Sequence, residues 1–187
     1  TGNGNDMVFA VPNGSEIAES DRQKAARLGY VGNYTRLGNS CWFTCLDHGR
    51  RHQPLPLMTM EDNFKFSKHK QIKGKKKYDK YDNYDAIEVP FTDAIPSDYS
   101  GVMGVPVSFL DKYNPDQFEI LGTSDNGLVD DKVKITQGLT KKFVDDYYKA
   151  GGTGAYKEGN PTAGYYENNV AKMAYKRIFI KHRKKIK

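Results

Sequence analysis

The lysine-rich run between residues 65 and 80 constrains the fold of this chain more than any other feature. It holds eight lysines and His69 against a single acid, Asp79. Its few apolar residues follow neither the 3.6-residue period of a helix nor the alternation of a strand. Such a run has too little apolar surface to form part of a packed core. It therefore predicts a basic, mobile loop at 65–80 that separates two core-forming regions, 1–64 and 81–187.

The composition indicates one domain, or one domain with an appendage, and a core rich in aromatic residues. The chain has 187 residues, a hydrophobic fraction of 37% and a mean hydropathy of −0.75, but also 13 Tyr and 9 Phe. Each aromatic side chain buries roughly 150–250 Å². No run approaches the roughly 20 apolar residues that a membrane span needs, and no signal peptide is visible. We therefore expect a cytoplasmic protein with no membrane partner, in which Cys41 and Cys45 are reduced and buried.

Local patterns predict an α/β fold. Within this fragment alone, the predicted class is α+β. Short apolar runs between turn residues predict strands, and periodic segments behind a hydroxyl residue predict helices. Ser15 and Thr140 are the expected helix caps. Glycines and a proline predict a loop at 101–106. The expected strands are 7–11, 41–46, 86–89, 118–121 and 175–180, and the expected helices are 16–26 and 141–150.

The charge distribution predicts a polyanionic partner. The net charge is +6, and a second basic cluster lies at 176–187. Lysine and arginine side chains that contact phosphates release counterions, which favours nucleic acid. A solvated loop and tail is the alternative interpretation. The candidate nucleic-acid contacts are Arg50, Arg51, Lys68, Lys70, Lys73, Lys75, Lys76, Lys77 and Lys80.

The usual arrangements of catalytic or metal-binding residues are absent or weak. His48 and His52 have a metal-ligand spacing, but the two arginines between them oppose a cation. Cys45 lies near His48 in sequence, yet it belongs to a run that we expect to be buried. We therefore assign no metal ligand and no catalytic residue.

Four runs carry a resemblance to a known family. They are GNSCWFTCLDH at 38–48, KYDNYDAIEV at 80–89, DYSGVMGVP at 98–106, and FLDKYNP with FEILG between 109 and 122. Together they resemble the C-terminal half of the EcoRI-type adenine-specific DNA methyltransferases. The resemblance implies the C-terminal part of a Rossmann-like methyltransferase sheet with appended DNA-facing loops. Residues 1–64 would then end the core sheet, and residues 81–187 would form the C-terminal sheet and the target-recognition region.

The resemblance also implies a function: DNA binding and target recognition in a site-specific adenine-N6 methyltransferase of a restriction–modification system. Double-stranded DNA would be the partner, and S-adenosylmethionine the cofactor of the full-length enzyme. No Pro-Pro dipeptide occurs, so the family's catalytic motif, Asn-Pro-Pro-Phe, has no match in this sequence. Asn114-Pro115 is instead predicted to form a turn. The glycines at 2, 4, 29 and 32 do not follow the strand–turn–helix order of a cofactor turn. We therefore expect a missing N-terminal catalytic half, no cofactor bound by this fragment, and no activity of the fragment alone.

Two alternatives remain open at this point. One is a non-enzymatic nucleic-acid-binding module, and the other is a phage-type structural protein with a lysine-rich loop. Within the methyltransferase interpretation, we expect Gly101 and Gly104 to lie on a loop that frames the target-base pocket. Bulky replacements at these two glycines would then reduce activity more than folding.

Overall fold

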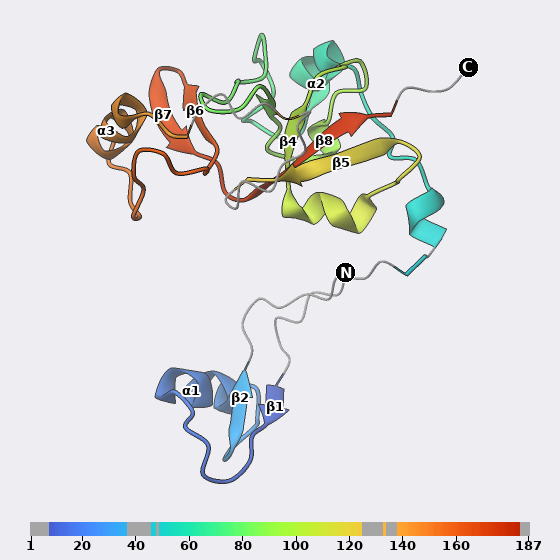
Figure 1. Ribbon diagram of the computed structural model, residues 1–187. Coiled ribbons are helices and arrows are strands. Elements are labelled where there is room, and N and C mark those ends of the chain that lie inside the picture. Colours follow the sequence, from blue (N-terminus) through green and yellow to red (C-terminus); the bar gives the residue numbers. More distant parts are fainter. Residues whose placement is uncertain (1–7, 37–45, 48, 125–132, 134–137, 184–187) are drawn as a thin grey trace. The chain divides into compact units, whose positions relative to one another are not determined.

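The structure, a computed structural model, describes residues 8–36, 46–47, 49–124, 133 and 138–183. The internal contacts divide the chain into two units, Thr1–Asp47 and His48–Lys187. Both units combine helices with strands, as Figure 1 shows, so the predicted mixed α/β class is confirmed. The predicted strand at 41–46 lies outside the described residues, apart from Leu46.

The first unit is a two-stranded ribbon with one helix. Strand β1 (Val8–Ala10) pairs antiparallel with β2 (Tyr34–Arg36), and α1 (Glu19–Arg27) lies between them in sequence. The prediction of a buried first strand is wrong, because two of the three residues of β1 are exposed. The predicted cap at Ser15 is also wrong. Ser15 belongs to a turn that its amide closes by donating to Pro12, and the helix begins later, behind Ala18.

The second unit is built on a mixed four-stranded sheet in the order β3-β4-β8-β5. The central strand β8 (Arg177–His182) pairs antiparallel with β4 (Met103–Pro106) on one side and β5 (Phe118–Thr123) on the other. The short edge strand β3 (Ile87–Glu88) pairs parallel with β4. The prediction of a loop at 101–106 is therefore wrong for residues 103–106.

Strand β8 is buried on both faces, because each face of the sheet carries its own core. Ile178 and Ile180 point into one apolar cluster, and Phe179 between them points into another. Alternation of side chains along a strand produces this division. The first cluster also holds Val89, Met103, Val105, Phe109 and Phe118, and the second also holds Tyr81, Tyr84, Val102, Leu121 and Ala174.

The remaining elements of the second unit are helices and one hairpin. Helix α3 (Lys141–Lys149) begins as predicted, because the Thr140 hydroxyl accepts a hydrogen bond from the Phe143 amide. It ends before Gly151, whose φ of +85° suits glycine. Thr59 caps α2 (Met60–Phe66) in the same way. The others are the short helices η1 (Gly49–His52), η2 (Thr92–Ala94) and η3 (Val107–Lys112) and the hairpin strands β6 (Gly164–Glu167) and β7 (Val170–Met173).

A buried ion pair crosses the sheet on the Phe179 face. The guanidinium of Arg177 donates to both carboxylate oxygens of Glu88, with Nη2 2.6 Å from Oε1. Glu88 is only 3% exposed. The Tyr81 hydroxyl donates to the same carboxylate. Burial raises the pKa of Tyr81, and the neighbouring Glu88 carboxylate raises it further, so the hydroxyl stays protonated and remains a donor.

Gly104 makes room for this arrangement. It pairs with Glu88 on one side and Phe179 on the other, and the Tyr81 ring lies directly over its Cα. A Cβ at this position would meet the Tyr81 hydroxyl and ring carbons. The Tyr81 ring also meets Phe179 edge-on, with centroids 6.0 Å apart. Gly104 therefore has a packing role in the fold, and its expected importance for activity stays a prediction.

We predict that Gly104→Ala destabilises the protein, because the added methyl group displaces Tyr81 from Glu88. Overpacking of this kind costs about 1–3 kcal/mol. The measurement is the urea midpoint of unfolding. Gly49→Ala is the matched control, because its Cβ would meet no atom within 4 Å. Equal midpoints for the two variants would contradict this account of Gly104.

Candidate nucleic-acid interface

The lysine-rich segment is anchored to the core of the second unit. Ile72 and Tyr78 are buried, at 1% and 4% exposure, and the Tyr78 hydroxyl donates to the Ala94 carbonyl over 2.6 Å. The Gly74 amide donates to the Phe64 carbonyl, which closes the segment back onto α2. The backbone that carries the lysines is thus held at several points. The limits 65–80 and the mobility of the loop stay predictions.

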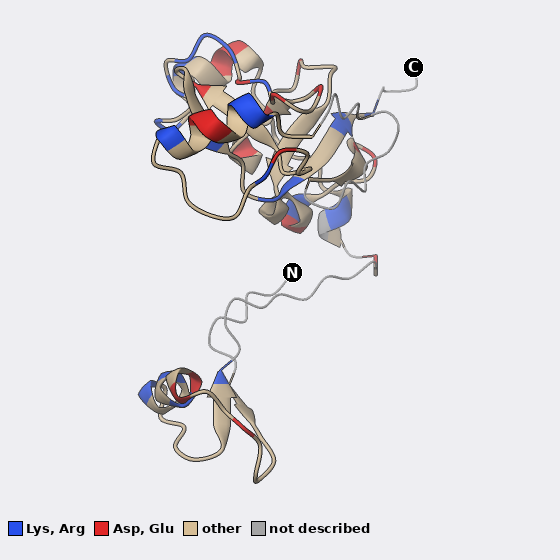
Figure 2. Ribbon diagram, turned by 60° about the vertical axis from the view of Figure 1, so that its left-hand side comes forward, with Lys and Arg blue, Asp and Glu red and all other residues tan. Residues whose placement is uncertain are grey.

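Five of the predicted contact residues are exposed lysines with no ion pair in the described part of the chain. Exposed ammonium groups on an anchored backbone can reach phosphates without first breaking a contact within the protein. Figure 2 shows the Lys and Arg positions of this unit in blue. The five are Lys70, Lys73, Lys76, Lys77 and Lys80.

Two other predicted contacts have partners within the protein. Lys68 Nζ lies 2.7 Å from the Asp93 carboxylate at an exposed site. Lys75 is mostly covered and lies between two acids, 2.6 Å from Asp79 and 2.9 Å from Glu167. Lys75 therefore holds the loop to β6 and is the least available of the lysines for a phosphate.

The acid that receives Lys75 also pairs with a lysine of the hairpin. Glu167 contacts Lys172, and hydrogen bonds from Lys172 and Lys75 hold the pKa of the Glu167 carboxyl below its usual value. These groups border a cavity of about 30 Å³ that also meets Tyr165 and Glu88. This is room for little more than a water molecule. The cluster is therefore a structural junction between the loop, the hairpin and the sheet.

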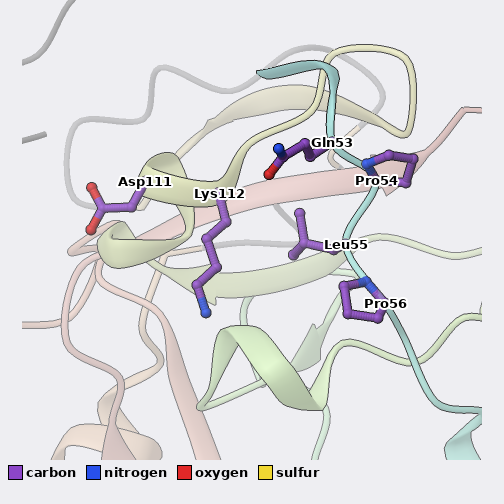
Figure 3. A pocket seen from close by; sticks show the side chains of 6 residues that line it. All are labelled: Gln53, Pro54, Leu55, Pro56, Asp111 and Lys112. Atoms are coloured by element: carbon purple, nitrogen blue, oxygen red, sulfur yellow. The ribbon is translucent and has the colours of Figure 1, made fainter. Parts of the chain in front are cut away.

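The predicted arginines lie apart from these lysines in sequence, on η1. Arg51 is half-buried and has partners within the protein, and the Arg50 side chain lies outside the described residues. The chain then runs through an extended connector, as predicted. The connector borders an open groove of about 470 Å³, and Figure 3 shows Asp111 at its edge pointing away from Leu55. The groove is lined by Gln53, Pro54, Leu55, Pro56, Asp111 and Lys112.

The two glycines proposed for a target-base pocket lie beside tyrosine rings. Gly101 is half-buried, and a Cβ there would meet the Tyr99 ring, as one at Gly104 would meet Tyr81. Both positions therefore have a packing role in this structure. Their role at a target base stays a prediction.

The family model of the adenine-specific methyltransferase EcoRI matches residues 1–183 of the chain. The chain belongs to this family. The type II methyltransferase M.EcoRI of Escherichia coli is 43% identical over 114 residues, which are 60% of this chain and 31% of that protein. The type II methyltransferase M.MpnI of Mycoplasma pneumoniae is 39% identical over 80 residues, 43% of this chain and 22% of that protein. The chain thus spans a third or less of these relatives, and no solved structure matches it.

The two described glycines considered for a cofactor turn in this EcoRI-family chain do not lie in the order that such a turn needs. Gly29 and Gly32 have positive φ, but they lie between α1 and β2, the reverse of the strand–turn–helix order of a cofactor turn. The Asn114 side chain accepts hydrogen bonds from the amides of Asp116 and Gln117, so Asn114-Pro115 is the predicted turn. Gly2 and Gly4 lie outside the described residues.

The described residues contain no group of three or more His, Cys, Asp or Glu that would hold a metal ion. None of their helices is long and apolar enough to cross a membrane.

Sequence reasoning missed the hairpin β6–β7 and its junction with the loop. Tyr165 and Tyr166 precede Asn168-Asn169, and a short alternating run follows. Two residues that tolerate positive φ between two such runs are a hairpin signal. The pairing of Glu167 with Lys75, 92 residues earlier, has no local signal.

We predict that Lys75→Met lowers stability by about 1–3 kcal/mol, because Asp79 and Glu167 lose a mostly buried partner. The pH dependence tests the cause. The folded pKa of Glu167 is depressed, so its contribution is fully present above the usual value of 4.5 and is lost as the pH falls through the lower folded value. The Lys75→Met variant should therefore lose less stability than the wild type as the pH falls below that value.

The measurement is the thermal midpoint at pH 7 and at several points below pH 4.5. Lys76→Met is the control, because Lys76 is exposed and has no ion pair in the described part of the chain. Identical acid profiles for both variants would show that Lys75 does not stabilise the junction.

Proposed function

We propose that this chain is the C-terminal, DNA-recognition part of a site-specific adenine-N6 methyltransferase of a restriction–modification system. The family membership over residues 1–183 supports this proposal, as do the type II methyltransferases among the relatives. The whole protein would act in the cytoplasm on double-stranded DNA with S-adenosylmethionine as methyl donor. An N-terminal half would supply the cofactor turn and the catalytic motif.

In this proposal residues 1–64 end the Rossmann-like sheet of the catalytic half. The second unit would carry the surface that faces DNA. The chain alone would transfer no methyl group, because it has no Pro-Pro dipeptide and therefore no match to the catalytic motif. Its own residues would bind and orient the duplex.

The observation that carries the DNA-binding role is the set of five exposed lysines on an anchored loop. Each lysine that contacts a phosphate releases condensed counterions, so affinity falls as salt rises. This contribution is independent of base sequence, and it positions the protein on the duplex. Lys75 would contribute least to it, because both of its acids lie within 3 Å.

We predict that the double variant Lys76→Gln/Lys77→Gln weakens DNA binding and reduces its salt dependence. The slope of log K against log salt should fall by about 2, since each phosphate contact contributes about 0.9. The measurement is a titration of a labelled duplex with the full-length protein at several salt concentrations.

The matched control is Lys149→Gln/Lys157→Gln, which removes the same charge from exposed lysines on α3 and the loop after it. We expect this control to keep the wild-type slope. A fall of the same size in both double variants would indicate a general charge effect and would refute the assignment of the loop. A wild-type protein that binds no duplex would refute the proposed function itself.

A further inference from the structure

The tip of the hairpin β6–β7 presents two asparagines to solvent. The pairing of Glu167 with Val170 leaves Asn168 and Asn169 as a two-residue turn. Their φ values of 51° and 64° are those of a type I′ turn, which matches the twist of the strands. Both are exposed, and neither carboxamide has a hydrogen bond in the described part of the chain. The donors and acceptors of both amides are therefore free.

The hairpin beneath this tip is held in place on two sides. Tyr166 packs edge-on against Phe143 of α3, with centroids 5.0 Å apart, and its hydroxyl donates to Asp146 over 3.0 Å. On the other side Tyr165 forms a β-bridge with Tyr81, and their rings meet at 6.3 Å. A polar tip on a supported element can be positioned accurately enough to recognise a ligand.

The tip is next to the basic loop. Glu167 is the last residue of β6 before the turn, and it pairs with Lys75 of the loop and Lys172 of β7. In Figure 1 the hairpin and the green loop lie side by side, as the Lys75–Glu167 pair requires. The loop that carries the exposed lysines and the tip that carries the two free amides are therefore neighbours.

We infer that the hairpin β6–β7 enters the major groove of duplex DNA and that the amides of Asn168 and Asn169 read base edges there. The inference rests on the proposed function. The major groove is about 12 Å wide and admits a two-stranded ribbon. A carboxamide donates and accepts side by side, which matches N7 and the N6 amino group of adenine. Adenine is therefore the base that these residues select, while the lysines contact the flanking phosphates.

Asparagine also favours positive φ, so the turn by itself explains why this residue type is present. Substitution by glycine separates the two roles. Glycine adopts positive φ more readily than asparagine and removes only the amide. Asn168→Gly/Asn169→Gly therefore keeps the hairpin and deletes the reading groups.

The experiment selects duplexes from a random-sequence pool with the full-length protein and sequences the bound fraction. We expect the wild type to prefer adenine at one or two positions. The glycine variant should relax that preference by about 5- to 150-fold, the factor that corresponds to a bidentate pair of 1–3 kcal/mol. Its thermal midpoint and its salt slope should equal those of the wild type.

A second variant, Asn168→Asp/Asn169→Asp, retains a residue that tolerates the turn but removes the donor. Carboxylates accept from the cytosine amino group, so the preference should move from adenine toward cytosine. The lysine pair gives the reciprocal result, because Lys76→Gln/Lys77→Gln should lower the salt slope and leave the base preference intact.

The outcomes separate this inference from the proposed function. A protein that binds duplex DNA with the predicted lysine effect, but whose glycine and aspartate variants keep the wild-type base preference, overturns the inference alone. So does a wild type that shows no base preference in the pool. A protein that binds no duplex overturns both.

Discussion

The buried ion pair between Glu88 and Arg177 is the interaction on which the second unit depends. Strand β3 is only two residues long, so its ladder with β4 is a weak attachment. The guanidinium of Arg177 crosses β4 and binds the Glu88 carboxylate in a bidentate geometry, which joins β3 to the central strand β8. Loss of one partner would leave an uncompensated buried charge, at a cost of about 3–5 kcal/mol. The chain that leads into β3 takes its position from this contact.

That chain carries the basic surface. Tyr78, Tyr81 and Tyr84 recur every three residues and are all buried, although no helix forms. Tyr78 packs in the cluster on one face of the sheet, and Tyr81 and Tyr84 pack in the cluster on the other. Lys80 lies between Tyr78 and Tyr81, Lys76 and Lys77 precede Tyr78, and all three lysines are exposed. The aromatic residues thus fix the backbone and the lysines supply the charge.

Affinity and base selection are separate in the proposed arrangement. Lysines on the anchored loop contact phosphates whatever the sequence, while the supported hairpin tip offers amides to base edges. The junction of Lys75, Glu167 and Lys172 joins these two parts. It also explains why one lysine in the middle of a basic run is structural. The Lys75 ammonium group is paired with two acids, whereas the lysines next to it in sequence have no ion pair in the described part of the chain.

The sequence by itself determined the family, the mixed class and the elements with strong local signals. Thr140 and the apolar residues behind it predicted α3 closely, and the alternating run near the C-terminus predicted β8 within two residues. Local energetics governs these features, because residues close together in sequence determine a helix cap or the alternating faces of a strand. The basic surface is likewise a property of composition.

Only the tertiary structure decided which residues of these sequence patterns contact one another. Gly104 looked like a loop glycine, because the ring of Tyr81 that requires it lies 23 residues earlier in the chain. Lys75 looked like any other lysine of its run until the fold placed Glu167 beside it. The hairpin tip became a candidate reading element once that pairing set it next to the loop. Such contacts join residues far apart in sequence, and the packing of the whole unit selects them rather than the preference of any one segment.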